Sequence, residues 1–168
     1  YTNAAPILRE MGLPASFFIA TGFIGTQHVP FWDEELPFRP SWMTWDQVKA
    51  LADMGFEIGA HTDTHVDLGK VDAGRARSEI ETSKHKLERE LGRPVPHFAY
   101  PFGGREHITE TTRALVPAAG FMCCVSAYGG GVTANDDTYN LQRMPISPWF
   151  DTPEQFGFEL LMQTRAAA

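Results

Sequence analysis

Two histidines lie four residues apart in the segment 61–65, which reads HTDTH. Side chains at this spacing share one face of a helical turn, so His61 and His65 could both reach one ion. Imidazole is a common ligand of zinc and of other late first-row metals. Two solvated loop histidines would show the same spacing. The position of the pair directly after the apolar run at residues 56–60 favours a metal site over this alternative.

A second segment with chemical potential is residues 98–104, which reads FAYPFGG. A strand that stops at Pro101-Phe102-Gly103-Gly104 leaves backbone N–H groups free at its end, and such groups can stabilise an oxyanion. The same residues would also suit a simple turn between a strand and a loop. The segment alone does not separate the two interpretations.

Helical patterns alternate with short apolar runs along the chain, which predicts an α/β fold with a parallel sheet. The predicted helices span residues 4–11, 45–54, 72–91, 109–119 and 152–164, and the predicted strands span 16–21, 56–60, 97–100, 121–126 and 139–146. Working residues of parallel α/β folds lie at the carboxyl ends of strands, which is where both segments fall. A long aromatic loop at residues 22–42 is expected to be functional.

Length, composition and net charge argue against some classes of protein. The 168 residues suit a single domain, and no apolar run is long enough to span a membrane. A net charge of -7 without a Lys/Arg cluster argues against a nucleic-acid partner. The adjacent Cys123 and Cys124 are not expected to form a disulfide and do not indicate a compartment, so the localisation stays open.

The two segments together carry a resemblance, because HTxTH followed by FAYPFGG resembles the second and third motifs of the polysaccharide deacetylase (NodB homology) family. Residues 3–18, the Met43-Thr44-Trp45 stretch and residues 55–59 also resemble that family. The resemblance extends from Asn3 to about Pro145 and covers most of the chain.

The resemblance implies an incomplete, distorted (β/α) barrel that hydrolyses N-acetyl groups of a polysaccharide with a divalent metal, expected to be Zn²⁺. In the family an Asp and two His hold the metal, its water attacks the acetamide, and a second Asp takes the proton. By matching, His61 and His65 would be metal ligands, and the backbone N–H of Phe102 would stabilise the oxyanion. Tyr100 and Pro101 would contact the substrate.

The sequence also departs from the family pattern. The first motif, TFDDG, is expected a few residues before Tyr1, so residues 1–168 are interpreted as one N-terminally truncated domain. We therefore expect this chain to bind metal weakly and to turn over nothing, and the full-length protein to be an active deacetylase. Ala99 stands at the place of an Arg in the third motif, Phe102 replaces a Tyr, and no His follows His107.

Some further residues have two interpretations. Asp63 could orient the histidines or be solvated, and His107 could line the mouth of the site. Tryptophans could form a sugar-stacking wall, although aromatic side chains are more often part of a core. The candidates for this wall are Trp32, Trp42, Trp45 and Trp149.

Three functions remain open from the sequence. The first is deacetylation of an N-acetylated polysaccharide, which the aromatic loop favours. The second is amide hydrolysis on a small molecule by the same fold. The third is a catalytically inactive domain that binds carbohydrate. The residues that precede Tyr1 in the natural protein would separate these possibilities.

Overall fold

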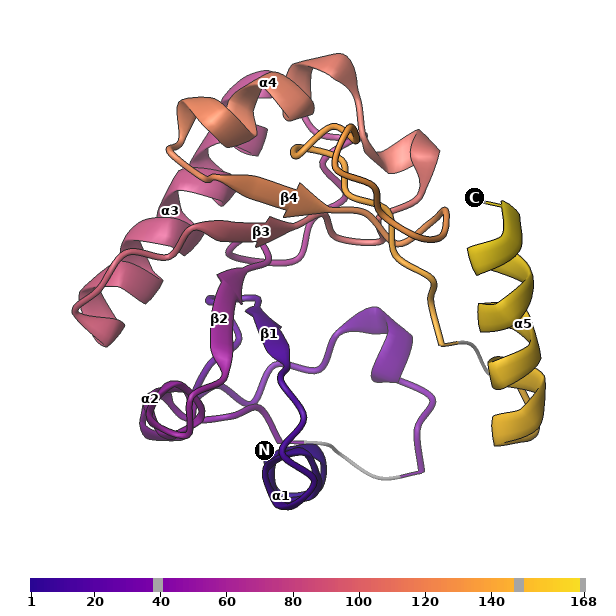
Figure 1. The fold of residues 1–168 in the computed structure, drawn as a ribbon. Coiled ribbons are helices and arrows are strands. Elements are labelled where there is room, and N and C mark those ends of the chain that lie inside the picture. The colour runs from indigo at the N-terminus through magenta and orange to yellow at the C-terminus, as the bar shows by residue number, and fades with distance from the viewer. Residues whose placement is uncertain (38–40, 147–149, 167–168) are drawn as a thin grey trace.

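The computed structural model describes residues 1–37, 41–146 and 150–166, with side chains described up to residue 162. Four parallel strands form one sheet (Figure 1), in the order β1-β2-β3-β4. The strands are β1 Ser16–Ile19, β2 Glu57–Ala60, β3 His97–Ala99 and β4 Cys123–Val125. The predicted α/β fold with a parallel sheet is confirmed.

The order of the strands places this sheet in the barrel class. Each strand pairs with the strand that precedes it in sequence, as in the register of Ser16 with Glu57 and of His97 with Cys123. Crossovers between parallel strands are right-handed, so an order that always advances in one direction leaves the crossover helices on one face. A doubly wound sheet would instead reverse its order. The sheet is therefore an open arc of a (β/α) barrel.

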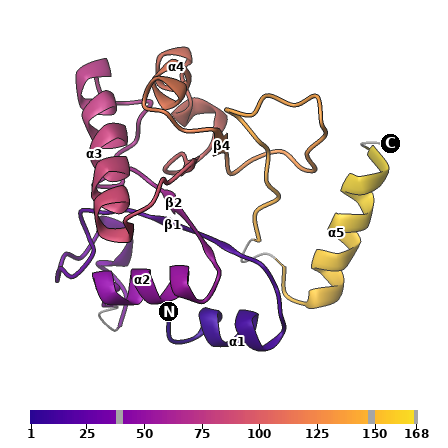
Figure 2. The ribbon, with the colours of Figure 1, turned by 60° about the vertical axis from the view of Figure 1, so that its left-hand side comes forward.

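Five α-helices and two short 3-10 turns accompany the strands. The helices are α1 Ala4–Glu10, α2 Trp45–Asp53, α3 Ala73–Leu91, α4 Glu110–Ala118 and α5 Pro153–Ala166, and the turns are η1 Phe31–Asp33 and η2 Arg105–His107. In Figure 2, α3 and α4 lie on one side of the strands, and α5 stands apart on the other side. None of the helices in the described part of the chain is both long and apolar enough to cross a membrane.

Local sequence explains where the helices begin and end. Thr44 and Thr109 each cap a helix with a reciprocal capping box, which satisfies backbone N–H groups that a helix start leaves free. Asp72 caps α3, and Gly92 ends it in the left-handed conformation. The predicted starts of these helices are confirmed.

The core lies between the sheet and the helices that pack on it, and α3 contributes the longest stretch of helix. Along α3 the buried positions recur with helical spacing and comprise Ala76, Glu79, Ile80, Ser83 and Leu87. From the sheet side, Ile58 and Phe98 contribute fully buried side chains to the same cluster. The sheet and α3 thus form the rigid base on which the loops at the strand ends are held.

One predicted strand, residues 139–146, is wrong. The segment runs beside β4, but only Leu141 forms a bridge, with Val125. The Arg143 amide donates to the Tyr128 carbonyl, beyond the end of β4, so the hydrogen bonding passes from the strand to a loop. Pro145 then has no amide with which to continue a ladder.

Candidate functional site

The site forms where β1, β2 and β3 end. His61 directly follows β2, and its amide donates to the Ile19 carbonyl in β1. Beyond the strands, the Gly22 amide donates to the Asp63 carbonyl at 2.7 Å. A Cβ on Gly22 would lie 2.8 Å from that carbonyl oxygen, so glycine allows the two loops to approach this closely. The expected position at the carboxyl edge of the sheet is confirmed.

The turn at residues 61–65, which we call the histidine turn, brings the two imidazoles together. The ring centroids of His61 and His65 are 4.7 Å apart and their planes meet at 72°. The turn is not helical, since Thr62 and His65 both have positive φ, at 62° and 55°. The expectation of a shared helical face is therefore wrong for the backbone, although the side chains meet as that expectation required.

His61 has a defined protonation state. Its Nδ1 lies 2.7 Å from the Ala99 carbonyl oxygen, and because a carbonyl only accepts, Nδ1 carries the proton. The other ring nitrogen, Nε2, then holds the lone pair that a metal would use. Burial, helped by the neighbouring His65 and the charge of Arg143, lowers the pKa of His61 to about 4 despite the opposing bond to Ala99. The imidazole is therefore neutral at neutral pH.

His65 is the less satisfied member of the pair. Its Nδ1 is buried and has no hydrogen-bond partner in the described part of the chain. Its ring lies 4.7 Å from the ring of Trp32 and 5.0 Å from that of Phe102, between centroids. Burial lowers the pKa of His65 below its usual value. A buried imidazole nitrogen without a partner is a group for which a ligand would compensate.

These two neutral imidazoles fit a divalent cation of the zinc type as ligands. Within residues 1–37, 41–146 and 150–162, no group of three or more His, Cys, Asp or Glu side chains is placed to hold a metal ion. Among the described side chains, His61 and His65 are therefore the pair that could bind such a cation.

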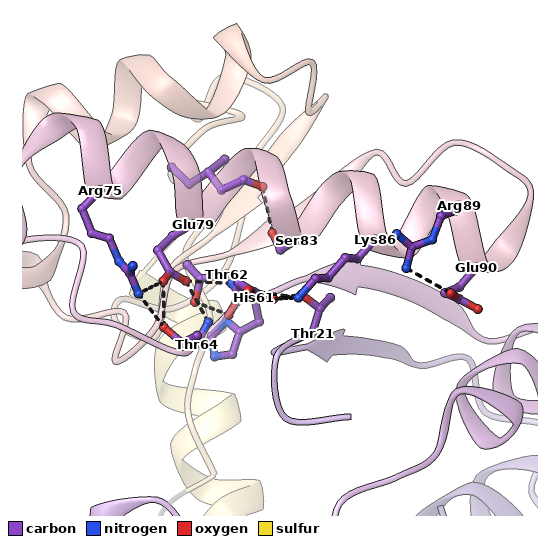
Figure 3. Close-up of polar contacts among 12 residues, drawn as sticks. Thr21, His61, Thr62, Thr64, Arg75, Glu79, Ser83, Lys86, Arg89 and Glu90 are labelled. Carbon is purple, nitrogen blue, oxygen red and sulfur yellow. Dashed lines mark hydrogen bonds and ion pairs between the residues drawn. The ribbon is translucent and has the colours of Figure 1, made fainter. Parts of the chain in front are cut away.

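Asp63 secures the histidine turn to its surroundings. Its carboxylate accepts from the Thr21 hydroxyl at 2.6 Å and from Lys86 Nζ at 2.8 Å. Thr21 follows β1 and Lys86 belongs to α3 (Figure 3). Asp63 therefore joins the turn to a strand end and to a helix, so that neither of its two interpretations, orienting the imidazoles or being solvated, describes its contacts.

The second predicted segment, residues 98–104, contains both buried and exposed side chains. Tyr100 is 1% exposed and donates its hydroxyl hydrogen to the Tyr139 carbonyl, and Pro101 is also buried. Neither lines the cavities around the histidines, so the structure does not bring these two predicted substrate contacts to the site. Phe102 is 41% exposed and has a φ of 62°. Its amide donates no hydrogen bond to the described backbone.

Two adjoining cavities form a cleft in front of the histidine turn. The smaller, of about 470 Å³, contains both histidines, and the larger, of about 730 Å³, extends past His107. Trp32, His65 and Phe102 line both. The volumes lie in the range of ligand pockets in proteins.

The tryptophans of the predicted wall have different positions. Trp32 lies between the cavities and Trp42 lines the smaller one, where its ring lies against Phe23. Trp45 packs against the hydrophobic core. Trp149 falls outside the described residues.

His107 lines the larger cavity, where it is held by Asp67. Its Nδ1 lies 2.7 Å from Asp67 Oδ2, which also pairs with Lys70 at 3.0 Å. Burial alone would raise the pKa of Asp67, but hydrogen bonds from Lys70, from the Gly69 amide and from His107 keep it below its usual value. The cleft thus combines aromatic and polar side chains.

Reasoning from sequence missed Glu79 and Lys86 of α3, which contact the histidine turn. Both lie inside a charged helix, where most acidic and basic side chains are solvated. The one available signal is that Glu79 falls in the stripe of Ala76, Ile80 and Ser83, which is otherwise apolar or small.

Comparisons with known proteins identify a family and a fold. The family model described as Polysaccharide deacetylase matches residues 1–124. The Bacillus subtilis protein YxkH, whose name assigns it to the polysaccharide deacetylases, is 25% identical over 148 residues, which cover 88% of this chain and 47% of YxkH. The chain thus spans about half the length of this curated relative.

Solved structures share the fold. The Streptococcus pyogenes deacetylase PplD in complex with acetate superposes with a TM-score of 0.76 at 24% identity, over 97% of this chain and 64% of PplD. IcaB from Ammonifex degensii superposes with a TM-score of 0.70 at 25% identity, over 89% of this chain and 64% of IcaB.

Proposed function

This chain belongs to the polysaccharide deacetylase family, and we propose that its cleft serves the metal-dependent removal of N-acetyl groups from a polysaccharide. The observation that carries the proposal is the pair of neutral imidazoles, 4.7 Å apart, at the wall of an open aromatic cleft. Neutral imidazole is the form that binds metals. Two such side chains beside a ligand-sized cavity suit hydrolysis better than simple structural packing.

We assign the metal to His61 and His65 and expect Zn²⁺. A divalent cation bound there would supply Lewis acidity toward the amide carbonyl and would make water more acidic. His61 is oriented by the Ala99 carbonyl, so the chain itself presents Nε2 of this residue. The Phe102 amide, which donates no hydrogen bond to the described backbone, would donate to the oxygen that becomes negative during hydrolysis.

The cleft supports a sugar as the substrate. Phe31 and Trp32 expose aromatic rings in the cavity that His65 lines, and the Asp67–His107 pair provides polar groups to the same cavity. Sugars present apolar ring faces and polar edges, and a cleft that combines aromatic and polar side chains matches both. We therefore propose Trp32 as a sugar-stacking residue.

A second candidate is binding of a polysaccharide without hydrolysis. It is favoured by the finding that the described residues supply two imidazoles and no third metal-ligating side chain, whereas catalytic zinc sites generally have three protein ligands. The cleft would then hold the sugar while no acetate is released.

The test is acetate release from a tetramer of N-acetylglucosamine by the natural full-length protein, with Zn²⁺ and after chelation. We expect release that depends on the metal and is lost in His61→Ala. The matched control is His85→Ala, because His85 is exposed on α3. Binding of the tetramer without any release would favour the second candidate, and neither binding nor release from N-acetylated glycans would overturn both.

A further inference from the structure

Glu79 is an unusual residue for the buried face of α3. Its side chain is only 3% exposed, and it stands in the stripe that otherwise packs Ala76, Ile80 and Ser83 against the core. A carboxylate taken out of water is costly unless its oxygens are hydrogen-bonded. The partners of Glu79 therefore indicate why it is tolerated there.

Most of these partners belong to the histidine turn. Oε2 of Glu79 accepts from the amides of Asp63 at 2.9 Å and of Thr64 at 2.8 Å. Oε1 accepts from the Thr64 hydroxyl at 2.7 Å and pairs with Arg75 at 2.6 Å. Figure 3 shows the Glu79 carboxylate directly beside Thr62 and Thr64, with Arg75 on its outer side.

The turn needs such a partner because of its backbone. Thr62 and His65 have positive φ, a conformation that residues with a side chain rarely adopt unless the surroundings impose it. The two amides that Glu79 binds lie between these residues, and successive amides that point at one anion form a recognised anion-binding arrangement. The carboxylate therefore fixes the chain at the centre of the turn.

The two histidines depend on this contact unequally. His61 is held separately, since its Nδ1 donates to the Ala99 carbonyl of β3. His65 follows Thr64 directly, and its Nδ1 has no partner in the described part of the chain. The turn thus sets the backbone from which the His65 ring projects, and the ring itself packs against Trp32 and Phe102.

We propose that Glu79 is a positioning residue that sets the orientation of His65 toward the metal. This inference rests on the proposed function, because it assigns to Glu79 a role in the proposed metal pair. Lys86, two helical turns further along α3, holds the same turn through Asp63. α3 therefore contacts the histidine turn through two residues. Of these, Glu79 binds the amide of Thr64, which directly precedes His65.

The test uses Glu79→Gln, which keeps the shape of the side chain and removes its charge. The matched control is Glu81→Gln, because Glu81 lies on the same helix and pairs only with Arg77 across exposed side chains. Two quantities are measured in the 168-residue chain: the affinity for Co²⁺ from its absorption spectrum, and the ring resonances of both histidines by NMR. We expect a loss of Co²⁺ affinity of about tenfold or more, shifted His65 resonances and unmoved His61 resonances, with the control unchanged.

Each outcome decides the proposal. Wild-type affinity and unmoved His65 resonances in Glu79→Gln would overturn the role of Glu79 and leave the metal site intact. If the wild-type chain binds no Co²⁺, the metal assignment fails, and the His65 resonances alone decide whether Glu79 orients this ring. If Glu79→Gln does not fold, Thr64→Val removes the contacts of the Thr64 hydroxyl with Glu79 and Arg75 and keeps both amide contacts of the turn. It should still shift the His65 resonances, and no shift would overturn the proposal.

Discussion

The histidine turn and the turn at residues 100–104 end neighbouring strands of the same sheet, and both contain residues with positive φ. Their surroundings differ. α3 binds the amides and the acidic side chain of the histidine turn through Glu79 and Lys86. In the other turn, Phe102 exposes its ring, and its amide donates no hydrogen bond to the described backbone.

We infer from this difference that the two turns have different functions. A ligand set for a metal gains from being held rigidly, because misplaced ligands weaken binding. A group that donates to a reacting oxygen must instead be available when the substrate arrives. Substitutions at Asp63 and His61 change the restrained turn, and substitutions at Phe102 and Trp32 change the exposed turn and the cleft beside it. We expect the first group to change stability more than the second.

Asp63→Ala should have the largest effect on stability. The change removes the acceptor of Thr21 and leaves Lys86 without its carboxylate, and loss of hydrogen bonds to a charged group costs about 2–3 kcal/mol of unfolding free energy. Urea denaturation measures it. The control is Asp53→Ala, at the exposed end of α2, with an expected change within about 0.5 kcal/mol. Equal effects of the two variants would contradict a restrained histidine turn.

The stability of the metal-free protein should fall as the pH is lowered from 7 to 5. Burial lowers the pKa of His61 to about 4, so between its folded and unfolded pKa values the unfolded chain binds more protons. The contribution of His61 is complete above its unfolded pKa and is lost as the pH falls toward 4. The loss of unfolding free energy that His61 causes between pH 7 and 5 is about 2 kcal/mol. Urea denaturation with a chelator at both pH values measures it.

His61→Asn is the control for this pH dependence. Its amide nitrogen can still donate to the Ala99 carbonyl in place of Nδ1, but the side chain does not titrate. The difference in stability between pH 7 and 5 should therefore be smaller in the variant. An unchanged difference would show that the buried imidazole is not its source.

At Phe102, glycine should be more stable than alanine. The φ of 62° costs a residue with a Cβ roughly 1 kcal/mol that glycine does not incur. Both variants lose the aromatic contacts, so the difference between Phe102→Gly and Phe102→Ala isolates the backbone. The same pair at exposed Met122, which is not among the residues with positive φ, should show the opposite sign. Alanine more stable than glycine at residue 102 would contradict the observed backbone.

Trp32→Ala should weaken binding of a tetramer of N-acetylglucosamine by several-fold. Its ring lines both cavities beside His65, and an aromatic contact contributes about 1 kcal/mol. Calorimetric titration measures the affinity. Met11→Ala, which changes an exposed apolar residue that lines neither cavity, should bind as the wild type does. Unchanged affinity in Trp32→Ala would remove the stacking role.

Much of the fold follows from local sequence. Thr44, Asp72 and Thr109 have the residue types that cap helices, and the apolar runs at residues 16–19 and 57–60 become paired strands. These signals are local, so the sequence alone carries them. The prediction of a strand at residues 139–146 was wrong because such a strand needs Leu141 and Arg143 to form hydrogen bonds along β4. The course of a distant loop decides whether they do.

The site was only partly predictable. The spacing of His61 and His65 identified the pair, and His107, for which the mouth of the site was one interpretation, lines the larger cavity. The positive φ of Thr62 is not visible in a sequence. Tyr100, predicted as a substrate contact, is buried and lines neither cavity, and an aromatic residue in a motif looks the same whether it faces a ligand or the core. Glu79 was missed because its partners are backbone amides of a turn far from it in sequence.

The most direct test of the central claim is the zinc content of the purified full-length protein by mass spectrometry, measured beside His61→Ala, His65→Ala and the exposed control His85→Ala. We expect near-stoichiometric zinc in the wild type and in His85→Ala, with loss of the metal in both His61→Ala and His65→Ala. Equal zinc in all four proteins, or no zinc in the wild type after incubation with the metal, would contradict the assignment of His61 and His65 as a metal pair.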